Sequence, residues 1–206
     1  MDILNLTLKA TRITAVLALV LVVGCKNDET KINLKQDAPE LGSEKFEEVI
    51  WHVKAFHPDG KLLDVKAVDS DGHTYDVKSI QNSDQTSIMD VKAFINGKKI
   101  PIKMLVSEDK FLPVKAIADD GTIINIKAIT PEGEKLDVKG VRQSGNVIHI
   151  RAIAKDGTTY NVEAISPKGW INDVIGIKLL STPIELTLNG VDVYAHVKSI
   201  PQTNQM

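Results

Sequence analysis

The sequence has no long apolar run, no excess of charge of one sign and only one cysteine, Cys25. Its main apolar stretch, residues 13–23, has eleven residues with Thr14 among them, whereas a membrane-spanning helix needs about 20. The 206 residues include 25 basic and 27 acidic side chains, so the charge excess typical of nucleic-acid-binding proteins is missing. We therefore expect no nucleic-acid partner, and no zinc site built from a cysteine cluster.

The apolar stretch has the features of an export signal. Lys9 and Arg12 precede it, and its length is typical of the core of a signal peptide. It ends in Val22-Val23-Gly24-Cys25, which resembles the lipobox of bacterial lipoproteins, and Lys26-Asn27-Asp28-Glu29 resembles the export signal of Bacteroidota surface lipoproteins. The resemblance implies cleavage before Cys25, lipidation of that cysteine, and an outer-membrane lipoprotein exposed at the cell surface. An ordinary secretory signal and a buried apolar segment are the alternatives.

This interpretation divides the chain into a signal peptide (1–24), a lipidated flexible tether (25–44) and a single domain (45–206). Cleavage removes one acidic and two basic residues and leaves 26 acidic and 23 basic ones, a net charge of −3. A lipidated Cys25 leaves no cysteine for a disulfide or for thiolate chemistry. Its acyl chains, at about 0.8 kcal/mol per buried CH₂, would anchor the chain in the membrane.

The domain is built from a short repeated phrase. In residues 63–80, LDVKAVDSDGHTYDVKSI, one phrase occurs twice, with Asp71-Gly72 between the copies. Its valine-like position recurs, at a spacing of twelve in most cases, at Val53, Val65, Val77, Val91, Ile102, Val114, Ile126, Val138, Ile150, Val162 and Val174. A basic residue follows every copy up to Ile150, and Xaa-Gly pairs separate most copies. Alternating β-rich residues between such turns predict antiparallel hairpins.

The spacing also predicts the register. A loop centred on Asp71 pairs Lys66 with Asp76 and Ala67 with Tyr75, and the same operation pairs a small residue with a large one in each hairpin. The fold class is therefore all-β: an antiparallel up-and-down meander of about 11 repeat strands plus a C-terminal hairpin, folded back as an open roll or a two-sheet sandwich. The C-terminal cap begins at about residue 166. Pro101 and Pro113 predict a weak or split seam near residues 100–115.

No catalytic constellation is visible. The histidines are scattered, and nucleophile and phosphate-loop motifs are missing. Asp69-Ser70-Asp71-Gly72 is similar to the start of a calcium loop, but Ile80 stands where the bidentate glutamate belongs. We expect no catalytic residue, no metal, no cofactor and no enzymatic activity. Trp51 and Trp170, which flank the regular copies, are interpreted as core plugs rather than ligand platforms.

The lysines after the valine-like positions form the best candidate binding surface. Most of them should pair with aspartates, but no carboxylate is expected directly opposite Lys115. The predicted basic strip consists of Lys92, Lys103, Lys115 and Lys127. It would suit an anionic glycan or the acidic patch of a protein partner, and an ordinary solvated face is the alternative.

The repeats resemble the lysine-rich meanders of spirochaete outer-surface proteins and tandem-repeat lipoproteins of Bacteroidota, a likeness that implies architecture and no functional residue. Three functions remain open. The first is a non-enzymatic, surface-anchored binding or scaffold module. The second is a carrier of an apolar ligand between the valine-rich faces, which requires a continuous cavity. The third is an enzyme, which requires polar side chains that converge in a pocket.

Overall fold

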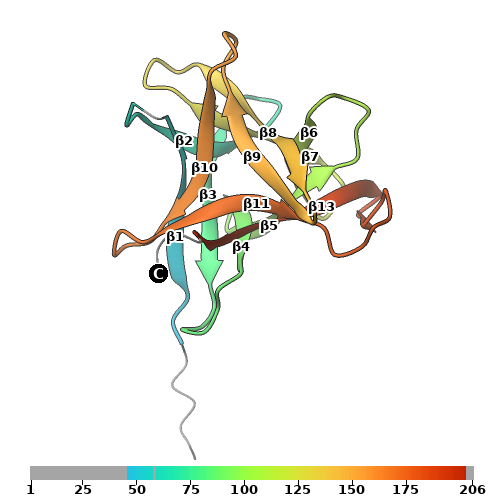
Figure 1. Ribbon diagram of the computed structural model, residues 1–206, viewed down its shortest axis with the longest axis horizontal. Coiled ribbons are helices and arrows are strands. Elements are labelled where there is room, and N and C mark those ends of the chain that lie inside the picture. Colours follow the sequence, from blue (N-terminus) through green and yellow to red (C-terminus); the bar gives the residue numbers. More distant parts are fainter. Residues whose placement is uncertain (1–45, 58, 203–206) are drawn as a thin grey trace, which may run out of the picture. The chain divides into compact units, whose positions relative to one another are not determined.

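The computed structural model describes residues 46–57 and 59–202, which form strands and turns (Figure 1). Cys25, the signal peptide and the tether lie outside the described residues. The described part contains thirteen strands and no helix, so it has no helix that could cross a membrane. The strands are β1 (Val49–Phe56), β2 (Leu62–Val68), β3 (Thr74–Gln81), β4 (Met89–Ile95), β5 (Lys98–Leu105), β6 (Leu112–Ile117), β7 (Ile123–Ile129), β8 (Lys135–Ser144), β9 (Val147–Ile153), β10 (Thr159–Ile165), β11 (Ile171–Ile177), β12 (Leu186–Leu188) and β13 (Val191–Pro201).

The hairpins have the predicted register. Lys66 lies opposite Asp76 and Ala67 opposite Tyr75 in the β2–β3 pair. Six turns share one hydrogen-bonding pattern, in which a glycine with positive φ closes the turn; they span residues 57–61, 69–73, 118–122, 130–134, 154–158 and 166–170. Asn96 and Gly97 have φ of 49° and 76°, as the predicted type I′ turn requires.

The repeat strands are arranged in groups of three. Within a group, each strand pairs along one half with one neighbour and along the other half with the second. For example, β1 pairs with β3 over Val49–His52 and with β2 over Lys54–Phe56, while β2 and β3 pair with each other. The described chain forms four such groups: β1–β2–β3, β4–β5–β13, β6–β7–β8 and β9–β10–β11. The C-terminal strand β13 thus completes a group that β4 and β5 begin.

The outer edge of each strand pairs with a strand from another group. The four groups make six pairs, and among the described strands each pair of groups is joined by one such ladder. The six ladders are β1–β10, β2–β7, β3–β4, β5–β6, β8–β9 and β11–β13. Four groups joined pairwise in this way have the connectivity of the corners and edges of a tetrahedron. Each repeat strand is therefore paired at both edges, and only β12, paired with β13 alone, keeps an open edge in the described part.

The predicted fold class is confirmed: the protein is an all-β antiparallel meander with a C-terminal hairpin, folded back on itself as one sheet. The β5–β6 ladder joins Ile102–Met104 to Val114–Ala116, and its three residue pairs make it the shortest of the described ladders between groups. By the same register, Pro101 and Pro113 lie just beyond its two ends, where neither can donate a hydrogen bond. The prolines shorten this seam as expected, but they do not split the sheet.

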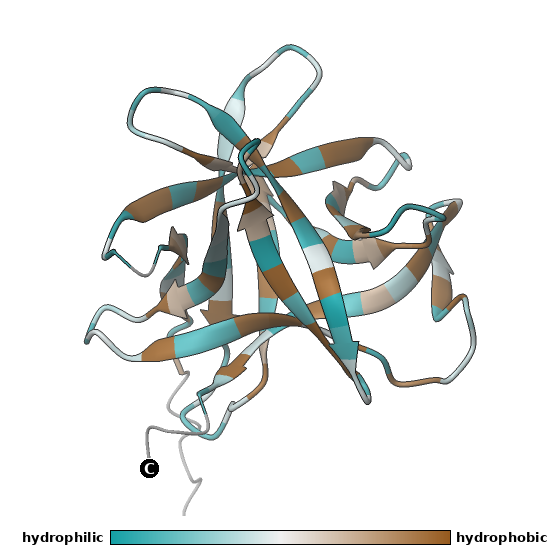
Figure 2. Cartoon of the chain, turned by 45° about the horizontal axis from the view of Figure 1, so that its top comes forward, coloured by the Kyte–Doolittle hydropathy of each residue, from teal (hydrophilic) through white to brown (hydrophobic). Residues whose placement is uncertain are grey.

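The valine-like side chains meet at the centre of the domain. Along each strand, apolar and polar residues alternate (Figure 2), and the apolar face turns inward. The eleven predicted positions and Val197 surround a central space of about 10 Å³, which is at the lower limit for a single water molecule. The space between the valine-rich faces therefore has no room for an acyl chain, and the carrier hypothesis lacks the cavity that it requires.

A small residue opposes a large one around this centre. Two positions after the valine, the described repeat strands carry Ala, Ser or Gly, and Met104 is the exception. Met104 lies opposite Ala195 and is fully buried. Two other copies make room for it: a Cβ atom would lie 2.8 Å from the Met104 Sδ at Gly140 and 2.5 Å from its Cε at Gly176. The sulfur-containing side chain thus fills space that two glycines leave open.

Candidate functional site

The predicted lysine strip is divided between two groups of strands. Lys92 and Lys103 belong to the β4–β5–β13 group, and Lys115 and Lys127 belong to the β6–β7–β8 group. The structure brings Lys103 and Lys115 together, because they lie opposite each other in the β5–β6 ladder. Lys92 lies opposite Lys78 in the β3–β4 ladder, and Lys127 lies opposite Lys66 in the β2–β7 ladder. The four lysines thus lie on four strands that are paired in sequence, and the two outer ones, Lys92 and Lys127, form ion pairs with Asp90 and Asp137.

Lys103 and Lys115 have no ion pair among the described residues. Lys103 Nζ lies 2.8 Å from His196 Nδ1, and burial, followed by the charge of Lys198, lowers the pKa of Lys103 to about 8. Lys115 donates to the side-chain oxygen of Asn125, and its pKa is lowered chiefly by burial. Both lysines are half-buried, and burial disfavours their charged form.

The paired aspartates make stability depend on pH. Lys66 donates to Asp76 at 2.6 Å and Lys78 lies 3.1 Å away, and the pKa of Asp76 is lowered from 3.8 to about 2, mainly by the hydrogen bond from Lys66. A lowered carboxyl pKa stabilises the folded state above pH 3.8, and this contribution is lost as the pH falls through about 2.

We expect Asp76→Asn to lower the free energy of unfolding by about 0.5–1 kcal/mol at pH 7, since the side chain is 46% exposed and screened by solvent. The difference from the parent protein should disappear near pH 2. Urea denaturation at both pH values measures it. An equal loss at both would mean that the charge of Asp76 does not cause it.

Turns and chain ends gather where three groups of strands meet. One cluster contains turns 130–134 and 154–158, linked by an ion pair of 3.2 Å between Glu134 and Lys155. We call another the terminal cluster. It is formed by the start of β1, the 82–88 loop between β3 and β4, turn 166–170 and the end of β13. It thus contains both ends of the described domain.

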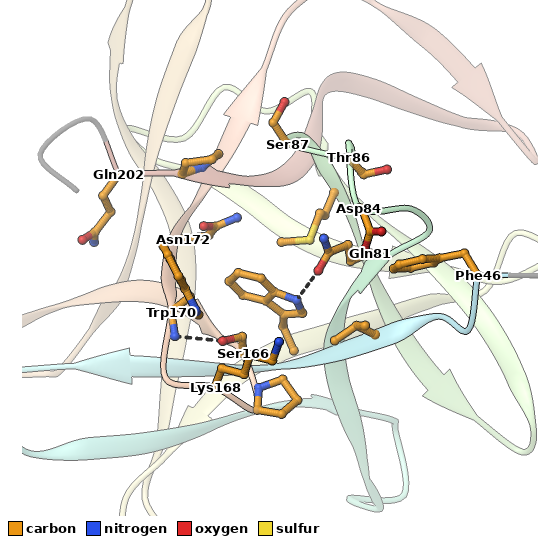
Figure 3. Close-up of a pocket in the computed structure, with 15 residues that line it drawn as sticks. Phe46, Gln81, Asp84, Thr86, Ser87, Ser166, Lys168, Trp170, Asn172 and Gln202 are labelled. Carbon is orange, nitrogen blue, oxygen red and sulfur yellow. Dashed lines mark hydrogen bonds between the residues drawn. The ribbon is translucent and has the colours of Figure 1, made fainter. Parts of the chain in front are cut away.

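The terminal cluster encloses a pocket of about 560 Å³, which we call the terminal pocket (Figure 3). Trp51, 8% exposed, contributes its indole, whose N–H donates to Gln81 Oε1 at 3.2 Å. Trp170 lines the same pocket with 60% of its surface exposed, and its backbone N–H donates to Ser166 Oγ at 2.8 Å. The volume lies within the range of roughly 300–1,000 Å³ that is usual for small-ligand sites.

A buried amide faces this pocket. Asn172 is only 5% exposed, yet its side chain makes no hydrogen bond to any other described residue. In the other described copies, its position two before the valine carries an aliphatic or aromatic residue, such as Leu63 or Leu136. No fully buried side-chain nitrogen or oxygen atom of the described residues lacks a hydrogen-bond partner, so the unpaired amide atoms of Asn172 are accessible from the pocket. Asn172 therefore offers a donor and an acceptor to a molecule in the pocket.

A comparison with protein families matches residues 47–200 to a family of unknown function, DUF7486. The chain belongs to the DUF7486 family. No curated protein and no solved structure shows significant similarity to it. The matched range includes almost the whole described DUF7486 domain, and thus Trp51, Trp170 and Asn172.

The expectation for the two tryptophans of the DUF7486 domain is half right. Trp51 is a buried plug as expected, but Trp170 is exposed, because it closes a turn instead of lying within a strand. The equivalent last residues of the other five turns in the described chain are polar: Lys61, His73, Thr122, Glu134 and Thr158. Comparison of the copies could have revealed this signal, since Trp170 and Asn172 both depart from the repeat within one copy.

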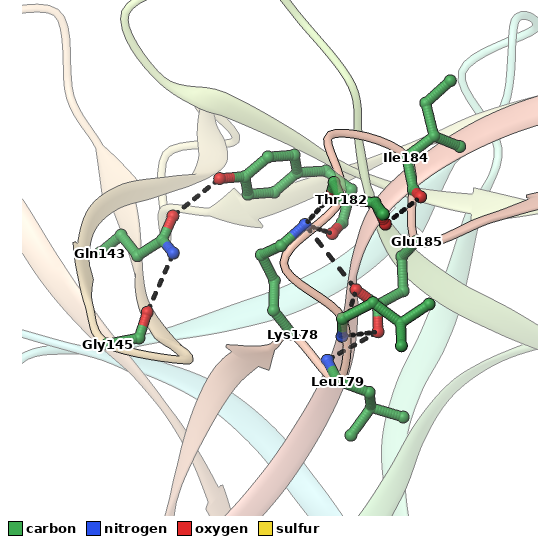
Figure 4. A network of polar contacts seen from close by, with 9 residues as sticks. Gln143, Gly145, Lys178, Leu179, Thr182, Ile184 and Glu185 are labelled. Atoms are coloured by element: carbon green, nitrogen blue, oxygen red, sulfur yellow. Dashed lines mark hydrogen bonds and ion pairs between the residues drawn. The ribbon is translucent and has the colours of Figure 1, made fainter.

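A second polar cluster of the DUF7486 domain is structural. Lys178 and Glu185 form an ion pair of 3.7 Å with side chains 6% and 2% exposed (Figure 4). Lys178 also donates to the carbonyl of Tyr194 at 3.1 Å, and Glu185 accepts from the backbone N–H of Leu179 at 2.6 Å. These partners satisfy both charges and hold the loop that follows β11. Among residues 46–57 and 59–202, no three His, Asp or Glu side chains are arranged to hold a metal ion.

Proposed function

We propose that the protein is a surface-anchored lipoprotein without enzymatic activity, and that its domain is a binding module with the terminal pocket as its binding site. The lipobox at Cys25 and the export signal after it support lipidation and display on the outer membrane. The observation that carries the binding function is the buried, unpaired amide of Asn172 beside the exposed indole of Trp170.

The repeat supports a functional origin for these two residues. Eleven described copies of the Asn172 position use an aliphatic or aromatic residue, and five copies of the Trp170 position use a polar one. Those copies form the same strands and turns, so the fold requires neither exception. An exposed aromatic and a buried amide both reduce stability or solubility, and such departures from local rules are typical of functional sites.

The proposed lipid anchor is close in sequence to residues that line the pocket. Phe46 and Val49, at the start of the described domain, line the terminal pocket. Residues 25–44 connect them to the proposed lipid anchor and span at most about 70 Å when fully extended. A ligand in the pocket would then be retained within that distance of the membrane.

Tryptophan fluorescence provides a direct test, because both tryptophans of the chain line the pocket. The chain from residue 25, with Cys25→Ser to prevent lipidation, would be titrated with neutral oligosaccharides, chondroitin sulfate, peptides and a fluorescent fatty acid. We expect at least one of these to shift the tryptophan emission. Trp170→Thr, which restores the residue of two other turns, should weaken that binding about ten-fold or more without lowering the melting temperature.

Lys61→Thr is the matched control, since it introduces the same residue at the equivalent position of another turn, and Lys61 does not line the pocket. It should leave binding unchanged. Binding that Trp170→Thr does not affect would place the site elsewhere. Salt-sensitive binding of chondroitin sulfate that is lost in Lys103→Glu/Lys115→Glu would favour the lysine strip and an anionic partner instead.

A further inference from the structure

The polar groups of the terminal pocket restrict the class of its ligand. Trp51 and Gln81 are already paired with each other, and Gln81 Nε2 also donates to the carbonyl of Ser83 at 3.2 Å. Asn172 is buried, lines the pocket and keeps its amide unpaired among the described residues. An amide both donates and accepts hydrogen bonds, so a matching ligand group must do the same.

Hydroxyl groups meet this requirement, and neither acyl chains nor anions do. An acyl chain would bury the Asn172 amide without a partner, which is unfavourable. A carboxylate or sulfate could accept from Nδ2 but would leave Oδ1 facing another acceptor. A hydroxyl can accept from Nδ2 or donate to Oδ1, and two neighbouring hydroxyls can do both.

The walls of the pocket require an apolar surface on the same ligand. The exposed indole of Trp170 lies beside the amide, and Met89 and Pro201 also line the space. An indole presents a flat apolar face, and stacking on it buries a large area at little entropic cost. A pyranose ring combines a face of C–H groups with a rim of hydroxyls, so it matches both the indole and the amide.

The charges of the pocket favour a neutral ligand. One carboxylate, Asp84, and one ammonium group, Lys168, line it, and both side chains are exposed. Their charges cancel, and the pocket has no cluster of cations that would attract an anionic polymer. This distinguishes the terminal pocket from the lysine strip.

We infer that the terminal pocket binds a neutral glycan, with one pyranose ring stacked on Trp170 and its hydroxyls hydrogen-bonded to Asn172. This inference rests on the proposed function of the terminal pocket as a binding site and adds the class of the ligand. Phe46 and Trp51 would contact neighbouring parts of the sugar chain, because they line the same space.

Asn172→Leu is the decisive variant, because leucine is the residue that three other copies carry at this position, Leu63, Leu112 and Leu136. Replacing an unpaired buried amide with a leucine should keep or raise the melting temperature. It should weaken the binding of neutral oligosaccharides about ten-fold or more, as the loss of hydrogen bonds predicts. Calorimetric titration and tryptophan emission would be measured with gluco-, manno- and galacto-oligosaccharides on the same Cys25→Ser chain.

The outcomes separate the inference from the proposed function. Neutral oligosaccharides that shift the emission of the parent protein, and bind neither Asn172→Leu nor Trp170→Thr, support both. A peptide or fatty-acid probe that shifts the emission when no neutral glycan does so overturns the glycan inference and leaves the pocket as a binding site. Neutral glycan binding that both variants retain overturns the inference, since the site then lies elsewhere. No response to any probe overturns both proposals.

Discussion

Ile150→Ala should lower the free energy of unfolding by about 2–5 kcal/mol, the range for truncating a fully buried aliphatic side chain. Ile150 is 0% exposed and lies at the centre, where it meets the valine-like side chains of the other repeat strands. Collapse of the surroundings into the new cavity is opposed, because the backbones around it are paired at both edges. Urea denaturation measures the loss. In a domain of this size each kcal/mol corresponds to about 2–4 °C in melting temperature.

Two variants control for this effect. Ile150→Val restores the residue found in most described copies and should cost only about 0.5–1.5 kcal/mol. Ile123→Ala removes the same atoms from a side chain that is 47% exposed and should cost less than about 1 kcal/mol. Similar losses for Ile150→Ala and Ile123→Ala would contradict a close-packed centre.

Met104 and Gly176 should show strong coupling in a double-mutant cycle. Met104→Ala leaves a cavity and should cost about 2–5 kcal/mol. Gly176→Ala places a Cβ atom 2.5 Å from the Met104 Cε and should cost about 1–3 kcal/mol by overpacking. Together the two changes restore the small residue of the other copies at both positions. The double variant should therefore be more stable than the sum of the single losses predicts, by about 1 kcal/mol or more.

The control for this cycle combines Gly176→Ala with Ile123→Ala, whose side chain is 47% exposed and belongs to neither buried cluster of the described residues. Those two losses should add within about 0.5 kcal/mol. Denaturation midpoints of the four proteins in each cycle provide the comparison. Additive losses for Met104 and Gly176 would show that the glycine does not exist to accommodate the methionine.

Much of the local structure could be predicted because its causes are local. Strand residues alternate with a period of two, and glycines with positive φ close the turns. The predicted pairs of Lys66 with Asp76 and Ala93 with Ile100 occur in the structure, because a hairpin of defined turn length permits only one register. The short seam at Pro101 and Pro113 follows from the missing N–H groups in the same local way.

The ladders between groups could not be predicted, because the repeats are too alike. Nothing in the phrase around Val53 favours β10 over another strand as the partner of β1, since the copies carry nearly the same residues. The copies differ at a few residues, and these residues select the partner strand only through contacts made in the folded protein. Ser79 and Ser199, 120 residues apart, form a buried hydrogen bond of 2.6 Å, and Lys54 lies opposite Glu163. Such contacts are invisible until the tertiary arrangement brings the strands together.

The candidate site was likewise predictable only in part from the sequence. The departure of Trp170 and Asn172 from the repeat could be read in the sequence, but their surroundings could not. The pocket forms because the start of β1, the 82–88 loop and the end of β13 meet turn 166–170. The lysine strip, by contrast, was predicted from hairpin registers alone, and the β5–β6 ladder between two groups joins its central members, Lys103 and Lys115.

The sequence by itself determined the strands, their turns, their register within hairpins and the inward face of valines, since each depends on residues close together in the chain. The tertiary structure alone decided which groups of strands pair, that the valine-like side chains fill the centre and leave no room for a carrier cavity, and that both ends of the domain enclose a pocket. The physical reason is that pairing between near-identical strands is decided by the few exceptional side chains, and their contacts exist only in the folded protein.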